Sequence, residues 1–590
     1  MKQFFKFMFA SMLGFFLSLF IVLVITLVVI SGLVSSVKSD TEISIQENSV
    51  LEITLDKQIN ERTANNPFEG FSFANFSPDR SMGLDDVLKN IKKAKRDTKI
   101  KGIFLNLSSI QAGMSTVEEI RNALVDFKQS KKFIYAYGED LSQGAYYIAS
   151  VADKIYLNPQ GGIDFKGLHA EMMFFKGALE KLEIEPEIIR HGKFKSAVEP
   201  FLLDKMSPEN REQIDALLSS LWSEVVSNLA VARKLSVDQV QEIADNFSTR
   251  SAEGALKSGM IDKIAYYDEV HADLLKITGQ GEKEKVKFIA LKKYDKAFVK
   301  AEKEWSNQKI AVIYASGDIV SGKGQEDEVG SDRLASAIRK ARMDSSIKAI
   351  VLRVNSPGGS ALASDVIWRE TVLAKKAKPF IVSMGDYAAS GGYYISCAAD
   401  TIVAEANTIT GSIGVFGLMF NAQKLFNNKL GITFDTAKTA RYADIGSTTR
   451  AMRNDEREII QSQVDKIYDS FVTHVSEGRG IKKETVDSIG QGRVWSGSDA
   501  VRIGLVDVIG GIQTAIDIAA RKANLENYRT ISLPEQKEFL EKIMEDLNTE
   551  VRSNMVKEEL GESYRYYTNL KEVVRQNGVL ARMPVGLTIE

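Results

Sequence analysis

Hydrophobic positions divide the chain into an uncharged N-terminal run and two long stretches in which strand-like and helix-like patterns alternate. Residues 7–37 carry no charged side chain and include the run FFLSLFIVLVITLVVISGLV. About 20 apolar residues are enough to span a bilayer, and this run is longer than the apolar core of a secretory signal peptide. We therefore predict a transmembrane helix at about residues 7–34, within an uncleaved signal anchor of residues 1–38.

The charges around this run predict its orientation. Lys2 and Lys6 precede it and Lys38 follows it. Because positive charge favours the cytoplasmic side, we expect the N-terminus in the cytoplasm and the rest of the chain across the membrane. In a bacterium, this corresponds to a single-pass protein of the inner (cell) membrane with its main body on the periplasmic or outer side.

Beyond the run, short apolar stretches rich in β-branched residues alternate with helical patterns. In the helical patterns, apolar residues recur three and four positions apart. This alternation predicts parallel strands covered by helices, an α/β fold, with sites beyond the carboxyl ends of the strands. In the second half of the chain the successive segments are KIAVIYASGDI, DRLASAIRKARMD, IKAIVLRV, PFIVSMGD and TIVAEA.

The same pattern of strands and helices occurs twice along the chain. IKGIFLNLSS from Ile100 matches IKAIVLRVNS from Ile347, and QGAYYIASVADKI from Gln143 matches SGGYYISCAADTI from Ser390, each at an offset of 247 residues. Two further pairs agree at offsets of 245 and 246: EGALKSGMID with SDAVRIGLVD, and MSPENREQI with MRNDEREII. Internal repeats at one spacing indicate a tandem duplication of one domain.

The repeat gives the domain boundaries. We predict an N-terminal domain over 39–300 and a C-terminal domain over 301–523, followed by a polar extension over 524–590 that has no repeat partner. Residues 60–80 read as a loop insertion, and the Lys/Glu-rich residues 275–305 as the connection between the domains.

Composition excludes several classes of function. The net charge is −2 without a long basic block, so nothing favours nucleic acid as a partner. The single cysteine, Cys397, cannot form an intrachain disulfide, and the four histidines follow no zinc-binding pattern. VNSPGGS lacks the Lys-Ser/Thr of a phosphate-binding loop. We expect no metal and no cofactor.

The two halves differ where chemistry is expected. Ser390 aligns with Gln143, and the double glycine of NSPGGS aligns with SSIQAG, so only the second half has these features. Only the first half has Lys195, where the second half offers Arg441 or Tyr442. Ser390 lies among alanines and glycines before an apolar run, a pattern that suits either a helix N-cap or a nucleophile.

A buried lysine can activate such a serine because burial disfavours its ammonium form, whereas arginine keeps its charge. Near Lys195 in the sequence are Phe194, Ala197, Val198 and Phe201. An alternative base is His191, four residues before Lys195. Backbone N–H groups of glycines can stabilise an oxyanion, and the candidates are Gly359 and Gly391.

These motifs resemble a known family. FKSAVEPF, VNSPGGS, AASGGYYIS and TGSIGVFG, in this order after an N-terminal anchor, are similar to the signal peptide peptidase A (protease IV) family in its long two-domain form. The resemblance implies a duplicated Clp-protease/crotonase-like fold. It also implies a membrane-bound serine endopeptidase that degrades cleaved signal peptides and assembles as a homotetramer.

Carried over residue by residue, the resemblance makes Ser390 the nucleophile and Lys195 the general base. Ser412 of TGSIG orients the lysine, and Gly359 and Gly391 form the oxyanion hole. The partners it implies are signal peptides, other hydrophobic segments and membrane lipid.

Three other functions stay open at this point. A crotonase-like enzyme acting on thioesters uses a related fold, but it has no need of an anchor. A second alternative is an inactive membrane scaffold. A third is a quality-control protease for membrane proteins, which differs only in its substrates.

Overall fold

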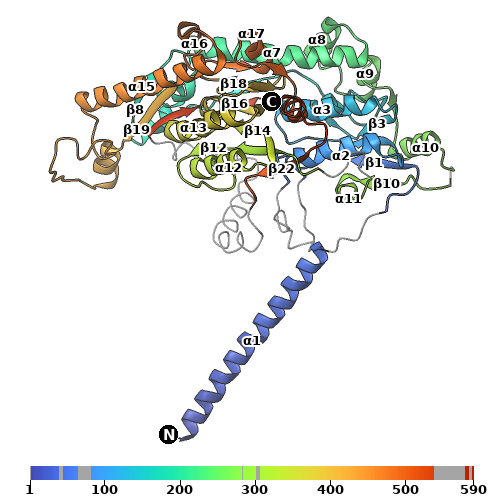
Figure 1. Ribbon diagram of the computed structural model, residues 1–590, viewed down its shortest axis with the longest axis horizontal. Helices are drawn as coiled ribbons and strands as arrows, with labels where there is room; N and C mark the ends of the chain where they lie inside the picture. Colours follow the sequence, from blue (N-terminus) through green and yellow to red (C-terminus); the bar gives the residue numbers. More distant parts are fainter. Residues whose placement is uncertain are drawn as a thin grey trace.

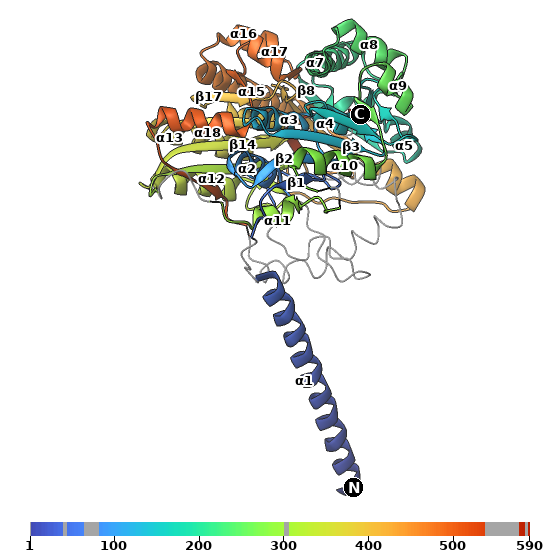
Figure 2. The same cartoon turned by 90° about the vertical axis from the view of Figure 1, so that its right-hand side faces the viewer.

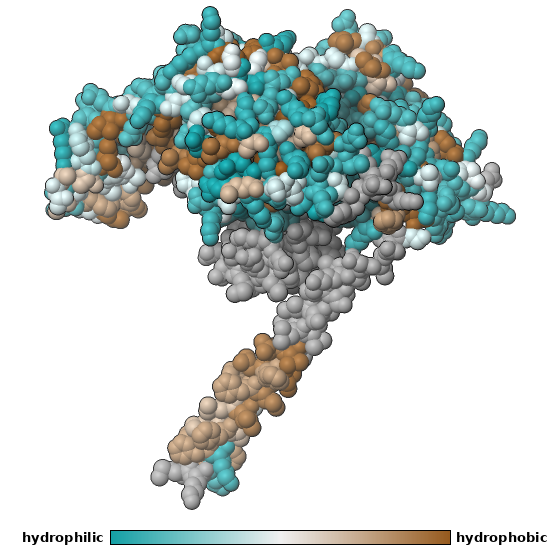
Figure 3. Space-filling view, in the orientation of Figure 1, coloured by the Kyte–Doolittle hydropathy of each residue, from teal (hydrophilic) through white to brown (hydrophobic). Residues whose placement is uncertain are grey.

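A long apolar helix projects from an α/β body (Figures 1 and 2). The computed structural model describes residues 2–38, 44–63, 82–281, 283–299, 306–536, 578–583 and 588–589. Helix α1 (Lys2–Lys38) includes the predicted segment and extends beyond it at each end. Its apolar part, Gln3–Val24, is 0% buried, and Figure 3 shows it below a mostly hydrophilic body. The predicted insertion at 60–80 and the extension at 524–590 lie largely outside the described residues.

The first half is built on a six-stranded sheet in which each neighbouring pair is parallel. In spatial order the strands are β10 (Phe288–Ala290), β1 (Ser49–Ile53), β2 (Ile100–Asn106), β3 (Phe133–Gly138), β5 (Lys154–Leu157) and β9 (Lys263–Ile264).

The second half repeats this order. Its parallel strands are β22 (Arg529–Leu533), β11 (Lys309–Ser316), β14 (Ile347–Ser356), β16 (Phe380–Ala389), β17 (Thr401–Ala404) and β21 (Val508–Ile509). Two more strands extend the sheet next to Ser390. β18 (Ile409–Gly411) pairs with the last three residues of β16, and β20 (Val494–Ser496) pairs with β18. The predicted α/β duplication is therefore confirmed.

Equivalent side chains make equivalent bonds in the two halves. The carboxylate of Asp153 accepts a 2.9 Å hydrogen bond from the backbone N–H of Ile134, and Asp400 accepts one of the same length from Phe380. These pairs are 19 and 20 residues apart along the chain. Each carboxylate ties the start of one strand to the turn before the next, so these shared aspartates have a structural role.

Helices cover each face of the second sheet. Ile310 and Val312 of β11 pack with α18 (Ile512–Lys522), whereas Ala311 and Ile313 pack on the side of α12 (Ser331–Met343) and α13 (Ala361–Ala377). Successive side chains of a strand point to opposite faces, and a sheet buried on each face needs apolar residues at consecutive positions. This explains the unbroken apolar runs in the sequence.

Two edge strands differ from the sequence expectation. β10 lies in the stretch expected to connect the halves, yet it pairs with β1. β22 lies in the extension expected to have no repeat partner, yet it pairs with β11 as β10 does with β1. These strands have three and five residues, and β22 is exposed at most positions. They therefore lack the long apolar run on which the prediction depends.

A third sheet joins distant parts of the chain. Its order is β13 (Glu328–Gly330), β12 (Asp318–Val320), β15 (Gly358–Ser360), β23 (Gly578–Arg582), β19 (Val415–Asn421) and β8 (Glu185–His191). β8 comes from the first half, and seven of its residues pair antiparallel with β19 of the second half. Lys195 follows β8 in the chain, so this pairing carries the lysine segment to the second half.

A buried ion-pair cluster also connects the halves. The guanidinium of Arg353, which is 0% exposed, donates to Glu61 and Glu119 of the first half at 2.8 Å each. It also donates to the Ser383 hydroxyl at 2.9 Å. Removing one partner of a buried ion pair leaves a charge without compensation.

We expect Arg353→Met to destabilise the protein by about 3–5 kcal/mol, because Glu61 and Glu119 would stay buried without their cation. The measurement is the urea midpoint of the detergent-solubilised full chain, followed by tryptophan fluorescence. Adding Glu61→Gln and Glu119→Gln to Arg353→Met should restore much of the loss. An unchanged midpoint for Arg353→Met would contradict the structural role of the cluster.

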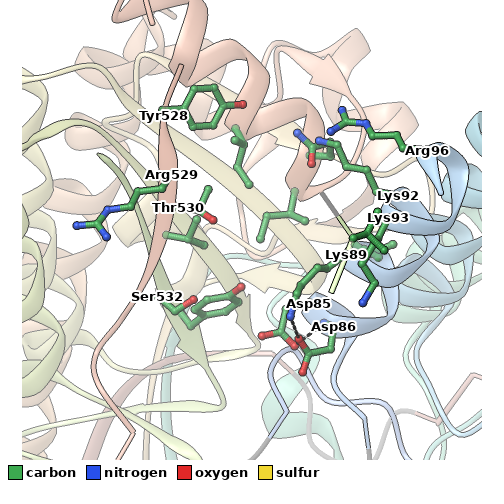
Figure 4. A pocket seen from close by; sticks show the side chains of 17 residues that line it. Asp85, Asp86, Lys89, Lys92, Lys93, Arg96, Tyr528, Arg529, Thr530 and Ser532 are labelled. Atoms are coloured by element: carbon green, nitrogen blue, oxygen red, sulfur yellow. Dashed lines mark hydrogen bonds and ion pairs between the residues drawn. The ribbon is translucent and has the colours of Figure 1, made fainter. Parts of the chain in front are cut away.

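A cavity of about 710 Å³ lies at the seam between the halves, and Figure 4 shows the side chains that line it. Lys89, Lys92, Lys93 and Arg96 line it from α2 (Leu84–Arg96), opposite Tyr528 and residues of β22. None of the five predicted site residues is among its lining residues. The cavity is therefore separate from the predicted site.

Candidate active site

Ser390 occupies a sharp turn between a strand and a helix. β16 ends at Ala389 and α14 (Gly391–Ser396) begins at the next residue. Ser390 has φ 53° and ψ −112°, a conformation that is costly for a side chain with a Cβ and that clusters at functional sites. Its hydroxyl makes no helix-capping hydrogen bond. The residue thus stands at the N-cap position, but its side chain is directed elsewhere.

The Ser390 hydroxyl meets Lys195 of the other half. Lys195 Nζ lies 2.8 Å from Ser390 Oγ, across 195 positions of sequence. Ser390 is 0% exposed and Lys195 is 1% exposed. Burial lowers the pKa of the Lys195 amine well below the 10.5 of an ordinary lysine. The structure therefore places an amine with a depressed pKa next to a buried hydroxyl.

Glycines make room for the lysine stem. A Cβ on Gly492 would lie 2.6 Å from Lys195 Cα, and one on Gly414 would lie 3.1 Å from its Cδ. These two glycines were not singled out from the sequence, although Gly414 lies in TGSIGVFG. Ala197, Val198 and Phe201, which lie near Lys195 in the sequence, are buried in an apolar cluster with Phe416 and Leu418.

Ser412 lies on the other side of the amine. Lys195 Nζ donates to Ser412 Oγ at 3.1 Å and to the Ser412 carbonyl oxygen at 3.3 Å. The Ser412 hydroxyl donates to the carbonyl oxygen of Gly492 at 3.3 Å, which leaves its lone pairs facing the amine. The structure thus brings together Ser390, Lys195 and Ser412.

Of the two predicted oxyanion glycines, Gly391 follows Ser390 directly, and Gly359 follows Gly358, which approaches the Gly391 backbone. Gly359 has φ 154° and pairs with Ile319 in the third sheet, and a Cβ on it would lie 2.1 Å from the Ile319 carbonyl oxygen. Its neighbour Gly358 has φ 107°, and the backbone nitrogen of Gly391 lies 2.8 Å from where a Gly358 Cβ would stand. Only residues without a Cβ allow this close approach of backbones.

The alternative base, His191, has other partners. Its Nδ1 lies 2.7 Å from Asp465 Oδ1, and its ring stacks on Tyr468 with centroids 4.0 Å apart. The Ser390 hydroxyl instead lies near Lys195 and donates to the carbonyl oxygen of Gly414 at 3.4 Å. The geometry therefore favours Lys195 over His191.

The structure also places a segment that sequence reasoning missed. Strand β23 lies between β15, which carries Gly358 and Gly359, and β19. The only sign of it in the sequence is the short apolar stretch GVLARMPVGL near the end of a polar tail.

Comparisons with known proteins agree with this architecture. The peptidase family S49 model matches residues 126–279 and 373–526, two stretches whose first residues are separated by the offset of 247 found in the repeat. Protease 4 of Haemophilus influenzae is 38% identical over 455 residues, which cover 75% of this chain and 74% of that protein. The chloroplastic serine protease SPPA of Arabidopsis thaliana is 33% identical over 502 residues, covering 83% and 72% respectively.

Among solved structures, a mutant ClpP1 from Listeria monocytogenes aligns with 35% of this chain and 94% of its own, at 15% identity and a TM-score of 0.24. The duplicated α/β fold and the two family matches define a serine protease with two homologous domains. More specifically, the chain belongs to peptidase family S49.

Proposed function

We propose that Ser390 and Lys195 form a catalytic dyad that hydrolyses peptide bonds, with Ser390 as nucleophile and Lys195 as general base. The observation that carries this proposal is the 2.8 Å separation of Lys195 Nζ and Ser390 Oγ in a buried site that lowers the pKa of the amine. A serine hydroxyl is a weak nucleophile until an adjacent base takes its proton, and a neutral amine can do so.

In the neutral Lys195 amine, the N–H bonds and the lone pair point to different partners. Its N–H groups donate to the hydroxyl and carbonyl oxygens of Ser412. The Ser390 O–H turns from the Gly414 carbonyl oxygen to the lone pair of the amine, which accepts its proton. Ser390 Oγ attacks the substrate carbonyl carbon, and the protonated lysine then gives its proton to the leaving amine. Water, deprotonated by Lys195, hydrolyses the acyl-enzyme.

The oxyanion of each tetrahedral intermediate needs fixed donors. Backbone N–H groups that are already oriented stabilise this charge without reorganisation. We assign this role to Gly359 and Gly391, because the positions of Gly358 and Gly391 bring these backbones together beside Ser390.

The substrates we propose are signal peptides left in the membrane after cleavage and similar hydrophobic segments. Two features support this assignment: the apolar cluster of Ala197, Val198, Phe201, Phe416 and Leu418 beside the site, and the apolar helix α1. We propose that α1 anchors the protein in a bacterial inner membrane, with the body on the periplasmic or outer side. Assembly as a homotetramer stays a prediction.

The test is hydrolysis of a Leu-rich signal peptide by the full chain in detergent micelles, with products identified by mass spectrometry. Peptide cleavage that disappears in Ser390→Ala supports the proposal. Preference for segments within intact membrane proteins would favour a quality-control protease. Turnover of thioesters without peptide cleavage would favour a crotonase-like enzyme.

Ser412 provides a graded prediction. We expect Ser412→Ala to lower kcat by about 10- to 100-fold with KM nearly unchanged, because the base stays present but loses its orientation. Steady-state kinetics with the same peptide measure this effect. Ser396→Ala is the matched control, since Ser396 is also fully buried but donates to the Gly392 carbonyl oxygen at 2.7 Å. Equal effects of the two substitutions would contradict the role of Ser412.

The pH dependence follows from the depressed pKa of Lys195. Only the neutral amine accepts a proton, so kcat/KM should fall as the pH drops through the pKa of Lys195 and level off above it. Because burial lowers this pKa well below 10.5, the plateau should begin well below that value. A rate that keeps rising up to pH 10.5, as for an ordinary exposed lysine, would contradict this assignment.

A further inference from the structure

A buried glutamine of the first half lies next to the segment that carries Lys195. Gln213 belongs to α7 (Pro208–Arg233) and is 2% exposed. Its amide nitrogen donates to the carbonyl oxygen of Phe194 at 3.1 Å and to the hydroxyl oxygen of Ser196 at 3.0 Å. One side-chain amide therefore holds the residue before Lys195 and the residue after it.

The oxygen of the same amide reaches the second half. Gln213 Oε1 accepts a 3.3 Å hydrogen bond from the backbone N–H of Val494 in β20. Because an N–H can only donate, this bond requires the amide oxygen to face Val494 and the amide nitrogen to face the lysine segment. Gln213 thus connects the two halves beside the proposed dyad.

The chain around Val494 also holds Ser412. The carbonyl oxygen of Arg493 accepts a hydrogen bond from the Ser412 N–H at 2.7 Å, and that of Gly492 accepts one from the Ser412 hydroxyl at 3.3 Å. Since Val494 follows these two residues directly, its bond to the amide fixes where Ser412 lies relative to the lysine segment.

Gln213 is itself held by buried polar neighbours. Its amide nitrogen also lies 3.0 Å from Asn210 Oδ1, and Asn210, which is 0% exposed, donates to the carboxylate of Glu199 at 2.9 Å. The same carboxylate accepts a 2.5 Å hydrogen bond from the hydroxyl of Ser207, the N-cap residue of α7. A buried polar network whose members are all paired makes a site rigid.

The repeat shows that this amide occurs only in the half that carries the lysine. At the offset of 246 residues that relates MSPENREQI to MRNDEREII, Gln213 aligns with Ile459. Burying a polar side chain is costly unless its hydrogen bonds are made, so an apolar residue would suffice if this position served only to pack the helix. The difference parallels that of Lys195 and Ser390, each of which occurs in one half only.

The pKa of the Lys195 amine depends on how firmly this segment is held. Burial is the cause of the low pKa. The charged groups around the segment are Lys193 and Arg493, which lie over the Phe194 ring, and Glu212, which pairs with Arg493 at 3.2 Å. A segment that moved away from its contacts would let water reach the amine and would raise its pKa.

We propose that Gln213 is a positioning residue that holds Lys195 in line with Ser390 and Ser412. This inference rests on the dyad proposed above. Gln213 bonds to the residues on each side of Lys195, so it acts on the reaction through the lysine. A displacement of about 1 Å in a catalytic group can lower a rate by about 10²-fold, so a base that is held less firmly should be a slower one.

The test is the pH dependence of hydrolysis of the Leu-rich signal peptide by Gln213→Met, whose side chain has a similar length but no amide. We expect kcat to fall by about 10- to 100-fold with KM nearly unchanged. We also expect the decrease of kcat/KM on the acid side to move to higher pH by about one unit, because the amine becomes less buried. A lower kcat without this movement would show a merely structural role and overturn the proposal.

Ser220→Ala is the matched control. Ser220 lies on the same helix, and its hydroxyl lies 2.7 Å from that of Ser496 in β20. The substitution therefore removes a bond between the same two elements without touching the lysine segment, and it should leave kcat and the pH profile unchanged. An equal movement of the pH profile in Ser220→Ala would overturn the proposal.

Gln213→Glu takes the place of Gln213→Met if the urea midpoint shows that the methionine variant does not fold. It keeps the shape of the side chain and the oxygen that faces Val494. Its second oxygen replaces the donor to Phe194 and Ser196, and its negative charge favours the ammonium form of Lys195. The acid side of the profile should again move to higher pH, and a profile that stays in place would contradict the assignment.

Stability measurements follow Lys195 without any catalysis. Lys195 alters the dependence of stability on pH only between its pKa in the folded protein and its pKa in the unfolded chain. The difference in urea midpoint between a chain and its Lys195→Ala counterpart should therefore begin to change at the folded pKa, and at a higher pH in the Gln213→Met background than in the wild-type background.

The two measurements together distinguish this proposal from the dyad. If the wild-type chain cleaves the peptide and the change begins at the same pH in each background, Gln213 does not position the lysine and the dyad stands. If the change begins at a higher pH in the Gln213→Met background but the wild-type chain cleaves nothing, the dyad is wrong and Gln213 still holds the lysine.

Discussion

Ser390→Ala and Lys195→Ala should each lower kcat for the Leu-rich signal peptide by at least about 10³-fold, because members of one catalytic unit lose their effect together. The double substitution should be no worse than either single one. Without Ser390 there is no group to form the ester, and without Lys195 the hydroxyl keeps its proton. Single-turnover hydrolysis of the peptide measures these losses directly.

Neighbouring side chains supply the controls for this result. Lys193 is exposed and two positions from Lys195, so Lys193→Ala should leave the rate unchanged. Lys195→Arg should be as inactive as Lys195→Ala, since a guanidinium stays protonated. If Lys195→Ala stayed active and His191→Ala did not, the base would be His191 with Asp465, and the dyad would be wrong.

Loss of activity in Lys195→Ala should not come from unfolding. The pKa of Lys195 is lower in the folded protein than in the unfolded chain, so the unfolded chain binds more protons at any pH between these two pKa values. This linkage makes the buried lysine a cost to stability below its unfolded pKa, and the cost decreases as the pH rises. We therefore expect Lys195→Ala to keep a urea midpoint near that of wild type.

Much of the fold follows from local patterns. β14 and β16 are long, apolar and buried on each face, so their sequences identify them without knowledge of their neighbours. The matching offset of 247 then extends each assignment to the other half. The edge strands β10 and β22 escape this reasoning because they are stabilised by pairing with one neighbour and not by a long apolar run.

The candidate site depends on information that no local pattern carries. Ser390 and Lys195 meet only because β8 crosses to β19, a pairing between residues more than 200 positions apart. The sequence shows instead that the two halves differ in a complementary way: only the first half has the lysine, and only the second half has the serine. The resemblance of the motifs assigns roles to Ser390 and Lys195, and the structure then gives the distance between their side chains.

β23 is the part of the site that is hardest to predict from the sequence. Its five residues have no counterpart in the repeat and no distinctive composition. Their conformation depends on two strand edges contributed by other segments, β15 and β19. An exposed edge binds any suitable extended segment through its main chain, so sequence alone does not reveal which segment it takes.

Gly358→Ala should lower kcat by about 100-fold or more, a loss comparable to that of an oxyanion-hole donor. The added methyl group would stand 2.2 Å from the Ala581 carbonyl oxygen and 2.8 Å from the Gly391 nitrogen, so it would push against the backbone N–H that we assign to the oxyanion hole. Gly167→Ala is the matched control: Gly167 has φ 98° against 107° for Gly358, but a Cβ there meets no atom within 4 Å. The two substitutions impose similar backbone strain, and only the first places a methyl group against the Gly391 backbone. Hydrolysis of the Leu-rich signal peptide and urea midpoints of the two variants separate these effects, and equal losses of activity would show that backbone strain, not contact with the Gly391 N–H, limits the enzyme.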